Sequence, residues 1–156
     1  MAKFEMKVPM IPQRKSMSCW YASACMVAAY FEGGPRLGLP KKWSEDQGLT
    51  LQEMFKLAKV EKMIQLNSAE HDFTAESLIA NLKYYGPLHC TNEWMAMKHA
   101  VVITGCSTEG PDGGKVYFND PLPEDHGITD EVTIKEFNEG RCRGFLFARD
   151  PDLRPA

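Results

Sequence analysis

The sequence has no excess of basic residues, and it has no hydrophobic run long enough to cross a bilayer. Its 18 Lys and Arg residues against 21 Asp and Glu residues give a formal net charge of −3, which leaves no broad basic surface for a nucleic acid. The first residues carry charge and proline where a signal peptide would have its apolar stretch. We therefore expect no signal peptide, and neither a nucleic acid nor a membrane as a partner.

Paired cysteines are missing as well, although the chain has five cysteines. Their number is odd and none forms a Cys-x-x-Cys pair, which argues against zinc and redox sites and favours a reducing compartment. The run Glu124-Asp125-His126 is a poor metal site, because three consecutive residues cannot all face one ion in regular structure. Neither Gly33-Gly34 nor Gly113-Gly114 opens a helix after a strand, as a phosphate loop does. We expect no metal and no cofactor.

No internal repeat, linker or low-complexity segment divides the chain. With 156 residues, 44% hydrophobic and 25% charged, it is typical of one globular domain with a sizeable core, so we expect a single domain over residues 1–156. Helical patterns come first. Residues 19–31 form an alanine-rich run that is apolar on most faces, and Thr50 and Thr74 are predicted to cap two further helices.

The helix after Thr50 is expected to bury Leu51, Met54, Phe55 and Ala58. Strand patterns then dominate, at residues 88–94, 99–105, 115–120 and 144–148, with a short helix predicted at 133–139. Helices followed by an antiparallel sheet define an α+β domain.

Gln13 and Cys19, six residues apart, supply two parts of an acyl-transfer site. Cys19 opens the first predicted helix, where unpaired backbone N–H groups and the helix dipole favour a thiolate, the form that attacks carbonyl carbon. The Gln13 amide can join the Cys19 backbone N–H in binding an oxyanion. The alternatives are a buried structural thiol for Cys19 and a solvated loop side chain for Gln13.

His99 is the preferred general base, because it begins a β-branched run that can hold an imidazole rigidly at the rim of a sheet. His89, inside a predicted strand, is its main rival. Asp120 is predicted to accept a hydrogen bond from the second imidazole nitrogen and to fix the tautomer. Asn119 can do the same without charge, but successive strand residues point to opposite faces, so only one of the two can serve.

The ordered motifs resemble the papain-like cysteine peptidases, and among them the compact bacterial branch of AvrRpt2-type effector proteases and related toxin domains. The resemblance covers about Val8 to Pro121 and depends on five segments: Val8-Pro-x-Ile-Pro-Gln, Ser16-Met-Ser-Cys-Trp-Tyr-Ala-Ser, Tyr85-Gly-Pro-Leu, His99-Ala-Val-Val-Ile-Thr-Gly and Asn119-Asp-Pro. It implies a reduced papain-like fold, in which a helical lobe with a central N-terminal helix packs on an antiparallel β-sheet lobe. The active-site cleft would lie between the lobes.

The resemblance also implies residue roles: nucleophile for Cys19, base and then acid for His99, orienting carboxylate for Asp120 and oxyanion donor for Gln13. Trp20, His89 and Trp94 are the residues expected to contact the substrate. At the position of His89, such proteins often have an aromatic residue, so this part of the substrate surface departs from the family pattern.

The implied activity is that of a monomeric endopeptidase, delivered by a secretion system into the cytoplasm of a target cell, where it cleaves particular proteins near small residues such as glycine. An inhibitor or immunity protein is a further expected partner. The same residues also fit deamidation, transglutamination or peptidoglycan amide hydrolysis. A papain-like binding module is the non-enzymatic alternative.

Overall fold

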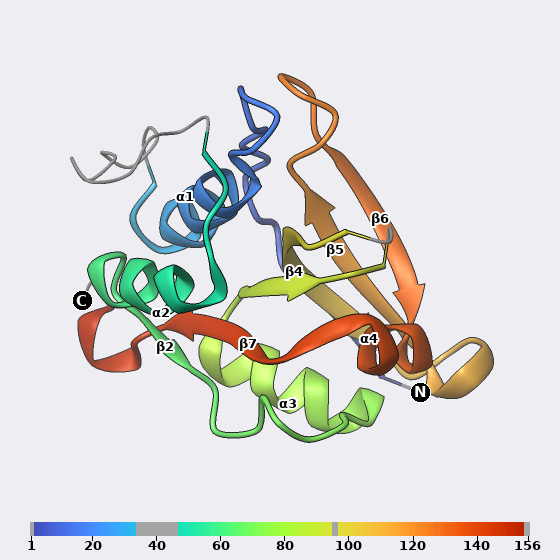
Figure 1. Ribbon diagram of the computed structural model, residues 1–156. Coiled ribbons are helices and arrows are strands. Elements are labelled where there is room, and N and C mark those ends of the chain that lie inside the picture. Colours follow the sequence, from blue (N-terminus) through green and yellow to red (C-terminus); the bar gives the residue numbers. More distant parts are fainter. Residues whose placement is uncertain (1, 34–46, 95–96, 155–156) are drawn as a thin grey trace.

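The computed structural model describes residues 2–33, 47–94 and 97–154, which form four α-helices, seven β-strands and two short 3-10 turns (Figure 1). The helices are α1 (Cys19–Glu32), α2 (Leu51–Val60), α3 (Ala75–Tyr85) and α4 (Ile134–Gly140). The strands are β1 (Lys3–Glu5), β2 (Met63–Gln65), β3 (Leu88–Asn92), β4 (His99–Ser107), β5 (Lys115–Asp120), β6 (Ile128–Thr133) and β7 (Arg141–Arg149). The turns are Pro111–Gly113 and Pro151–Leu153.

All the described strands belong to one antiparallel sheet with the order β2-β7-β3-β4-β5-β6, and β1 pairs with the end of β4. This sheet, together with the helices, confirms the predicted α+β class. The four predicted strands are present as β3, β4, β5 and β7. Because β3 and β4 pair with Asn92 opposite His99, the start of β4 lies at the rim of the sheet.

The sheet is covered by helices on both faces (Figure 1). On one face, α1 and α2 pack against Val102 and Phe147 of the sheet. On the other face, α3 and α4 share a core with side chains such as Val101 and Leu146. Ten of the fourteen residues of α1 are buried, which explains why this helix is apolar nearly all around. None of the described helices is long and apolar enough to cross a membrane.

Three helices begin with a capping box, in which a threonine hydroxyl accepts the backbone N–H three residues later and that residue's side chain accepts the threonine N–H. Thr50 and Thr74 confirm the predicted starts of α2 and α3. Thr133 caps α4, the predicted short helix. These starts are local features, and the sequence pattern alone locates them.

The predicted buried face of α2 needs a correction. Met54 and Ala58 are buried, and Leu57 joins them, but Leu51 and Phe55 are exposed. Leu51 lies at the N-terminal end of the helix, where it lines a cleft rather than the core. Phe55 packs from outside on the rings of Phe145 and Phe147, with centroid distances of 5.1 and 5.6 Å.

Three strands, β1, β2 and β6, were not predicted. β1 and β2 have three residues each, too few for an alternating pattern to be visible. β6 reads as polar because it is an edge strand that pairs only with β5, so both of its faces are largely exposed.

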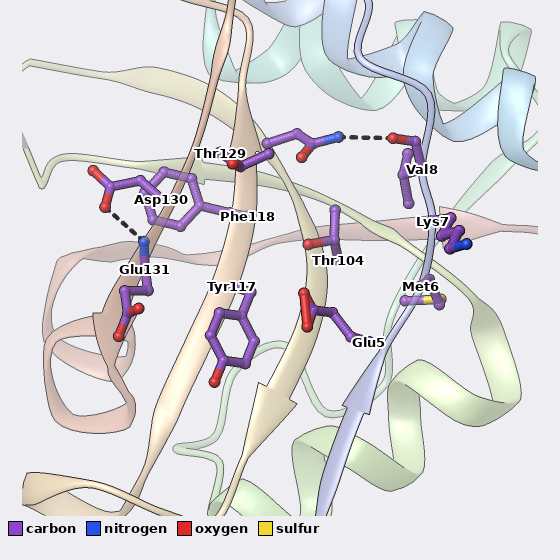
Figure 2. A pocket seen from close by; sticks show the side chains of 11 residues that line it. Glu5, Met6, Lys7, Val8, Thr104, Tyr117, Phe118, Thr129, Asp130 and Glu131 are labelled. Atoms are coloured by element: carbon purple, nitrogen blue, oxygen red, sulfur yellow. Dashed lines mark hydrogen bonds between the residues drawn. The ribbon is translucent and has the colours of Figure 1, made fainter.

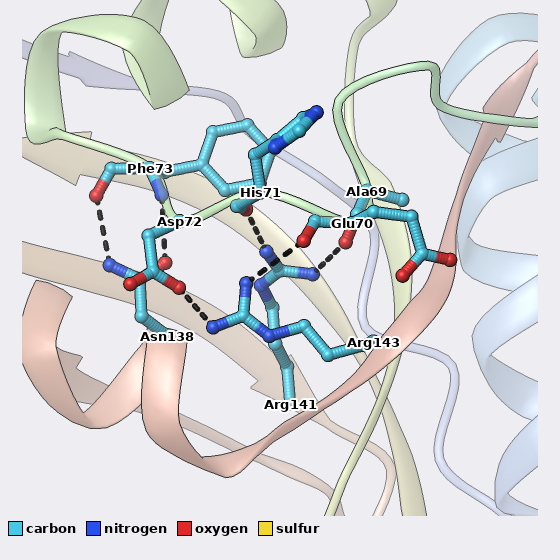
Figure 3. A network of polar contacts seen from close by, with 8 residues as sticks. All are labelled: Ala69, Glu70, His71, Asp72, Phe73, Asn138, Arg141 and Arg143. Carbon is cyan, nitrogen blue, oxygen red and sulfur yellow. Dashed lines mark hydrogen bonds and ion pairs between the residues drawn. The ribbon is translucent and has the colours of Figure 1, made fainter.

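A buried arginine fastens the segment between β2 and α3 to β7 (Figure 3). Arg141, the first residue of β7, donates hydrogen bonds to the backbone carbonyls of Ala69 and His71. Its guanidinium lies over the rings of Phe73 and Phe137, 5.1 and 5.5 Å from their centroids. Burial lowers the pKa of Arg141 from its ordinary value, because removing the guanidinium from water disfavours its charged form.

Two further side chains hold the same segment (Figure 3). Asn138 of α4 accepts the Phe73 N–H at 2.8 Å and donates to the Phe73 carbonyl at 2.8 Å. Arg143, which is more exposed than Arg141, forms an ion pair with Asp72. These side chains tie the loop before α3 to β7 and α4, in addition to the backbone bonds from the Leu66 N–H to the Leu146 carbonyl at 3.0 Å and from the Gly144 N–H to the Ala69 carbonyl at 3.4 Å.

Candidate active site

A cleft of about 220 Å³ lies between the first turn of α1, the segment that leads into α2, and the start of β4. Both Cys19 and His99 line this cleft, although they are eighty residues apart in the chain. The other described lining residues are mostly apolar: Ser16, Met17, Trp20, Gly48, Leu49, Thr50, Leu51, Met54, Thr91, Met97, Lys98, Ala100 and Leu122.

Cys19 is the first residue of α1 and is partly exposed at the cleft. Ser18 occupies the N-cap position, but its hydroxyl does not cap the helix. That hydroxyl donates to the Lys15 carbonyl at 3.0 Å and accepts the Lys15 N–H at 3.2 Å. The first N–H groups of a helix have no intrahelical partner, and no acceptor for the Cys19 N–H is found within the described residues. Within the part of the chain that the structure describes, a hydrogen-bond donor next to the sulfur is therefore left without a partner.

His99 and Asp120 form a buried pair at the rim of the sheet. His99 Nε2 and Asp120 Oδ1 are 2.6 Å apart, and the same oxygen accepts the Leu122 N–H at 2.9 Å. Cys19 is the other neighbour of the imidazole, and its interaction with the ring raises the pKa of His99. Because Nε2 serves Asp120, Nδ1 is the ring nitrogen left for the sulfur.

Asn119, the alternative orienting residue, points to the opposite face of β5. Its amide donates to the Val8 carbonyl at 3.1 Å and contacts the Met26 sulfur at 3.8 Å. The alternation of side chains along the strand separates the two neighbours, and it is Asp120 that reaches the imidazole.

The surroundings of His99 favour its protonated form. Burial is the largest influence and lowers the pKa of the imidazole, but the hydrogen bonds to Asp120 and Cys19, together with the charges of both groups, outweigh it. The pKa of His99 is raised to about 9 from its ordinary value of 6.5. At neutral pH the base is therefore an imidazolium beside the sulfur.

Gln13 is fully buried and is not among the described residues that line the cleft. Its Nε2 donates to the carbonyls of Lys15 and Ser16 at 2.8 and 3.1 Å, and its Oε1 has no hydrogen-bond partner within the described residues. Its backbone N–H donates to the Pro121 carbonyl at 3.0 Å, next to Asp120. The amide thus lies beside the loop that precedes Cys19 but is not directed into the cleft.

Trp20 lines the cleft with an indole that is 3% exposed. The indole N–H donates to the Gln47 carbonyl at 2.8 Å. This bond ties the first turn of α1 to the segment that forms the opposite wall of the cleft.

His89 and Trp94, which were expected to contact the substrate, are not among the described residues that line the cleft. His89 is 0% exposed because the first turn of α1 covers it. Trp94 packs on the rings of Phe118 and Phe137, 5.0 and 6.2 Å between centroids, and its indole donates to the Glu136 carbonyl at 3.1 Å. The sequence around His89 and Trp94 does not indicate which part of the hydrophobic core each side chain will join.

The apolar wall of the cleft is the part of the site that sequence reasoning missed. Leu49, Leu51 and Met54 form it on the α2 side, and Thr91 and Ala100, a cross-strand pair of β3 and β4, form its floor. Alternation along β4 assigns Ala100 to the face opposite His99, so strand parity alone would not have placed it in the site, and the approach of α2 depends on the tertiary fold.

A second groove, of about 430 Å³, lies between the N-terminal segment Glu5–Val8 and the strands β4, β5 and β6 (Figure 2). Its lining includes Thr104, Tyr117 and Glu131, but neither cysteine nor histidine. It therefore offers no nucleophile and base pair like that of the cleft. Among the described residues, no group of three His, Cys, Asp or Glu side chains could hold a metal ion.

Comparison with known proteins gives a match that agrees with this geometry. The sequence model of a family described as papain-like cysteine protease AvrRpt2 matches residues 3–141. The match spans most of the chain and includes α1, the apolar cleft wall and the strands that carry His99 and Asp120.

Proposed function

The chain belongs to the papain-like cysteine proteases of the AvrRpt2 family, and from this we propose that it is an endopeptidase with a Cys19, His99 and Asp120 triad. The observation that carries the proposal is the imidazole of His99, hydrogen-bonded to Asp120 and lining the same cleft as the Cys19 thiol, with which it interacts. The contacts are those that nucleophilic catalysis by a thiolate needs: a base next to the sulfur and a group that orients the base.

The first half of the reaction forms an acyl enzyme. The Cys19 sulfur attacks the carbonyl carbon of a peptide bond, and the carbonyl oxygen takes up the negative charge of the tetrahedral intermediate. When the intermediate collapses, the C–N bond breaks and His99 gives its Nδ1 proton to the leaving amine. Asp120 keeps the ring in the orientation that this transfer needs.

The second half of the reaction releases the acyl group. A water molecule takes the place of the amine, gives a proton to the now neutral His99 and attacks the thioester carbon. The C–S bond breaks, and the product is a free carboxyl group. The thiolate and imidazolium are restored, so no co-reactant other than water is consumed.

The free N–H of Cys19 is the first donor for the oxyanion, and we propose the Gln13 amide as the second. For this role, a hydrogen on Gln13 Nε2 must exchange the Lys15 or Ser16 carbonyl for the substrate oxygen. Its position beside the loop that leads into Cys19 supports this role.

The shape of the cleft supports an extended peptide as substrate. A cleft of about 220 Å³ with apolar walls favours a small residue such as glycine at the scissile bond and an apolar residue against Leu49, Leu51 and Met54. Trp20 would shield the thioester from water on one side.

The proposal extends to the place of action. Five free cysteines, none joined in a disulfide, are compatible with a reducing cytoplasm. We propose that the enzyme acts as an effector or toxin domain on a protein of a target cell, as a monomer, and that an inhibitor or immunity protein can cover the cleft. These points are supported by family membership rather than by a contact on the molecule.

The test is to incubate the purified protein with target-cell lysate and to map new protein termini by mass spectrometry. Wild type should create a small set of new termini, and Cys19→Ala and His99→Ala should create none. Cys142→Ala is the matched control, because Cys142 is also partly exposed but is not among the described residues that line the cleft.

The proposal is wrong if Cys19→Ala produces the same new termini as wild type. A mass gain of about one dalton on glutamine residues without cleavage would replace peptidase activity by deamidation at the same triad. Muropeptide products would indicate a wall amidase instead.

A further inference from the structure

His89 joins the strand β3 to the first turn of α1. Its side chain is completely buried, and its Nε2 lies 3.1 Å from the backbone carbonyl of Trp20. Trp20 directly follows Cys19 in that turn. This hydrogen bond therefore connects the sheet with the first turn of α1, at the residue after the nucleophile.

The direction of this bond is fixed by its acceptor. A carbonyl oxygen can only accept, so His89 Nε2 carries the hydrogen and the ring is neutral with its proton on Nε2. Burial lowers the pKa of His89 to about 4, which keeps the ring neutral at physiological pH. The ring is then a permanent donor, unlike the imidazolium of His99.

The same pair of strands holds both imidazoles. In the β3–β4 ladder, His89 lies opposite Val102. His99 precedes Val102 by three positions in β4 and lies opposite Asn92. The ring of His89 also packs edge-on against Phe147 of β7, with 6.4 Å between centroids. The strands thus hold the His89 ring from the sheet side while its Nε2 holds α1.

A polar ring at this position is not needed to fill the core. Nδ1 of His89 has no hydrogen-bond partner within the described residues, and such a buried polar atom costs about 1 to 3 kcal/mol. An apolar side chain of similar volume would avoid that cost. Compared with such an apolar side chain, histidine adds a hydrogen-bond donor to the Trp20 carbonyl.

On the basis of the proposed triad, we infer that His89 is a positioning residue, whose bond to the Trp20 carbonyl sets the distance between the Cys19 sulfur and the His99 imidazole. Without the bond, the first turn of α1 is free to shift by fractions of an ångström along the sheet. Errors of about 1 Å in the placement of reacting groups can cost about 100-fold in rate.

The decisive variants are His89→Gln and His89→Asn. The glutamine Nε2 is as many bonds from Cβ as the histidine Nε2, so it can donate to the Trp20 carbonyl. The asparagine amide is one bond shorter and cannot reach. Both variants place a neutral amide in the same buried site, so they share most of the cost to folding.

The readouts are kcat and KM for peptide cleavage, and the pH profile of Cys19 alkylation by iodoacetamide, which reports the pairing of the thiolate with His99. We expect His89→Gln to keep kcat within about threefold of wild type and to leave the pH profile of alkylation unchanged. We expect His89→Asn to lower kcat about 10-fold or more with little change in KM, and to shift the alkylation profile. His89→Leu, where it folds, should behave like His89→Asn.

Cys90→Ala is the matched control for lost packing, because Cys90 is the next residue of β3 and lies in the core on the other face. It should lower the melting temperature and leave the alkylation profile unchanged. Equal kcat values and profiles for the Gln and Asn variants would overturn the inference. Alkylation does not require cleavage, so the inference about His89 and the proposed peptidase function can fail separately.

Discussion

The protonation of His99 determines how the activity depends on pH. The reactive state pairs a thiolate with an imidazolium, and the imidazolium supplies the proton for the leaving amine. Since the pKa of His99 is raised to about 9, that proton is present at neutral pH and is lost as the pH rises through about 9. Activity should therefore fall on the alkaline side near this value.

Asp120→Asn tests the origin of this limit. The substitution removes a carboxylate that raises the pKa of His99 through a hydrogen bond and through its charge. We expect the alkaline limb of kcat/KM to move to lower pH and kcat at neutral pH to fall about 100-fold. Peptide hydrolysis measured between pH 5 and 10 checks both effects. An unchanged alkaline limb would mean that Asp120 does not tune the base.

Gln13→Ala tests the second oxyanion donor. Loss of one such donor typically lowers kcat about 10²- to 10³-fold, and KM should change much less. The amide also bonds the carbonyls of Lys15 and Ser16, so a purely structural role would instead lower the melting temperature and leave kcat intact. Steady-state kinetics together with thermal unfolding separate the two roles.

At the scale of elements, the capping box of α2 supports the apolar wall of the cleft. Thr50→Ala removes the N-cap and should destabilise the helix start by about 1 kcal/mol. Because Gly48, Leu49 and Leu51 adjoin this cap and line the cleft, we expect KM to rise while kcat changes little. Thermal unfolding and peptide hydrolysis give the two numbers.

Thr74→Ala is the control for this prediction. Thr74 caps α3 with the same kind of box, but α3 packs on the other face of the sheet. It should lower the melting temperature about as much as Thr50→Ala and leave KM unchanged. Thr50→Ser should restore both properties of wild type, since serine retains the hydroxyl. If KM rises equally in both alanine variants, the wall does not depend on the cap.

The elements that could be predicted from the sequence are those with local causes. The starts of α2 and α3 follow from threonine caps, and β3, β4, β5 and β7 follow from apolar runs of sufficient length. β6 could not be predicted, because an edge strand with little burial has no apolar alternation to read. Leu51 precedes the part of α2 that meets the core, and Phe55 lies at the exposed edge of the buried face, where it packs on Phe145 and Phe147.

At the scale of the whole molecule, the hydrogen bonds of Arg141 to the loop before α3, which we call the Arg141 clamp, should be a main source of stability far from the cleft. Arg141→Met keeps the apolar stem but removes the guanidinium donor of both carbonyls, so that, within the described residues, Ala69 keeps only the Gly144 N–H at 3.4 Å and His71 loses its side-chain donor. We expect the free energy of unfolding to fall by about 1 to 3 kcal/mol, because a buried polar group that loses its partner costs about that much. Urea unfolding measures it.

Arg143→Met is the matched control, because its ion pair with Asp72 is much more exposed and exposed pairs contribute about 0 to 1 kcal/mol. The pH profile of Cys19 alkylation should be unchanged in both variants, since the clamp packs on the face of the sheet away from α1. Similar unfolding curves for the two variants would show that Arg141 does not act as a clamp.

The types of the site residues and their order along the chain could be predicted from the sequence. Their arrangement in space could be predicted only where it has a local cause. A helix N-terminus at Cys19 and the strand parity of Asp120 are local, and the structure brings both to His99. The burial of His89 depends on the approach of the first turn of α1 to β3, and no spacing in the sequence encodes that approach. Trp94 illustrates the same limit, because its partners Phe118 and Phe137 come from later segments.

The position of β6 at the end of the sheet has a consequence for solubility. Within the described residues, one side of this strand has no neighbour, so its backbone can template a strand from another copy of the chain. Asp130 and Glu131 put negative charge along that margin and oppose stacking of identical molecules. Neutralising both, by acid or by substitution, should promote filament growth, which light scattering would detect.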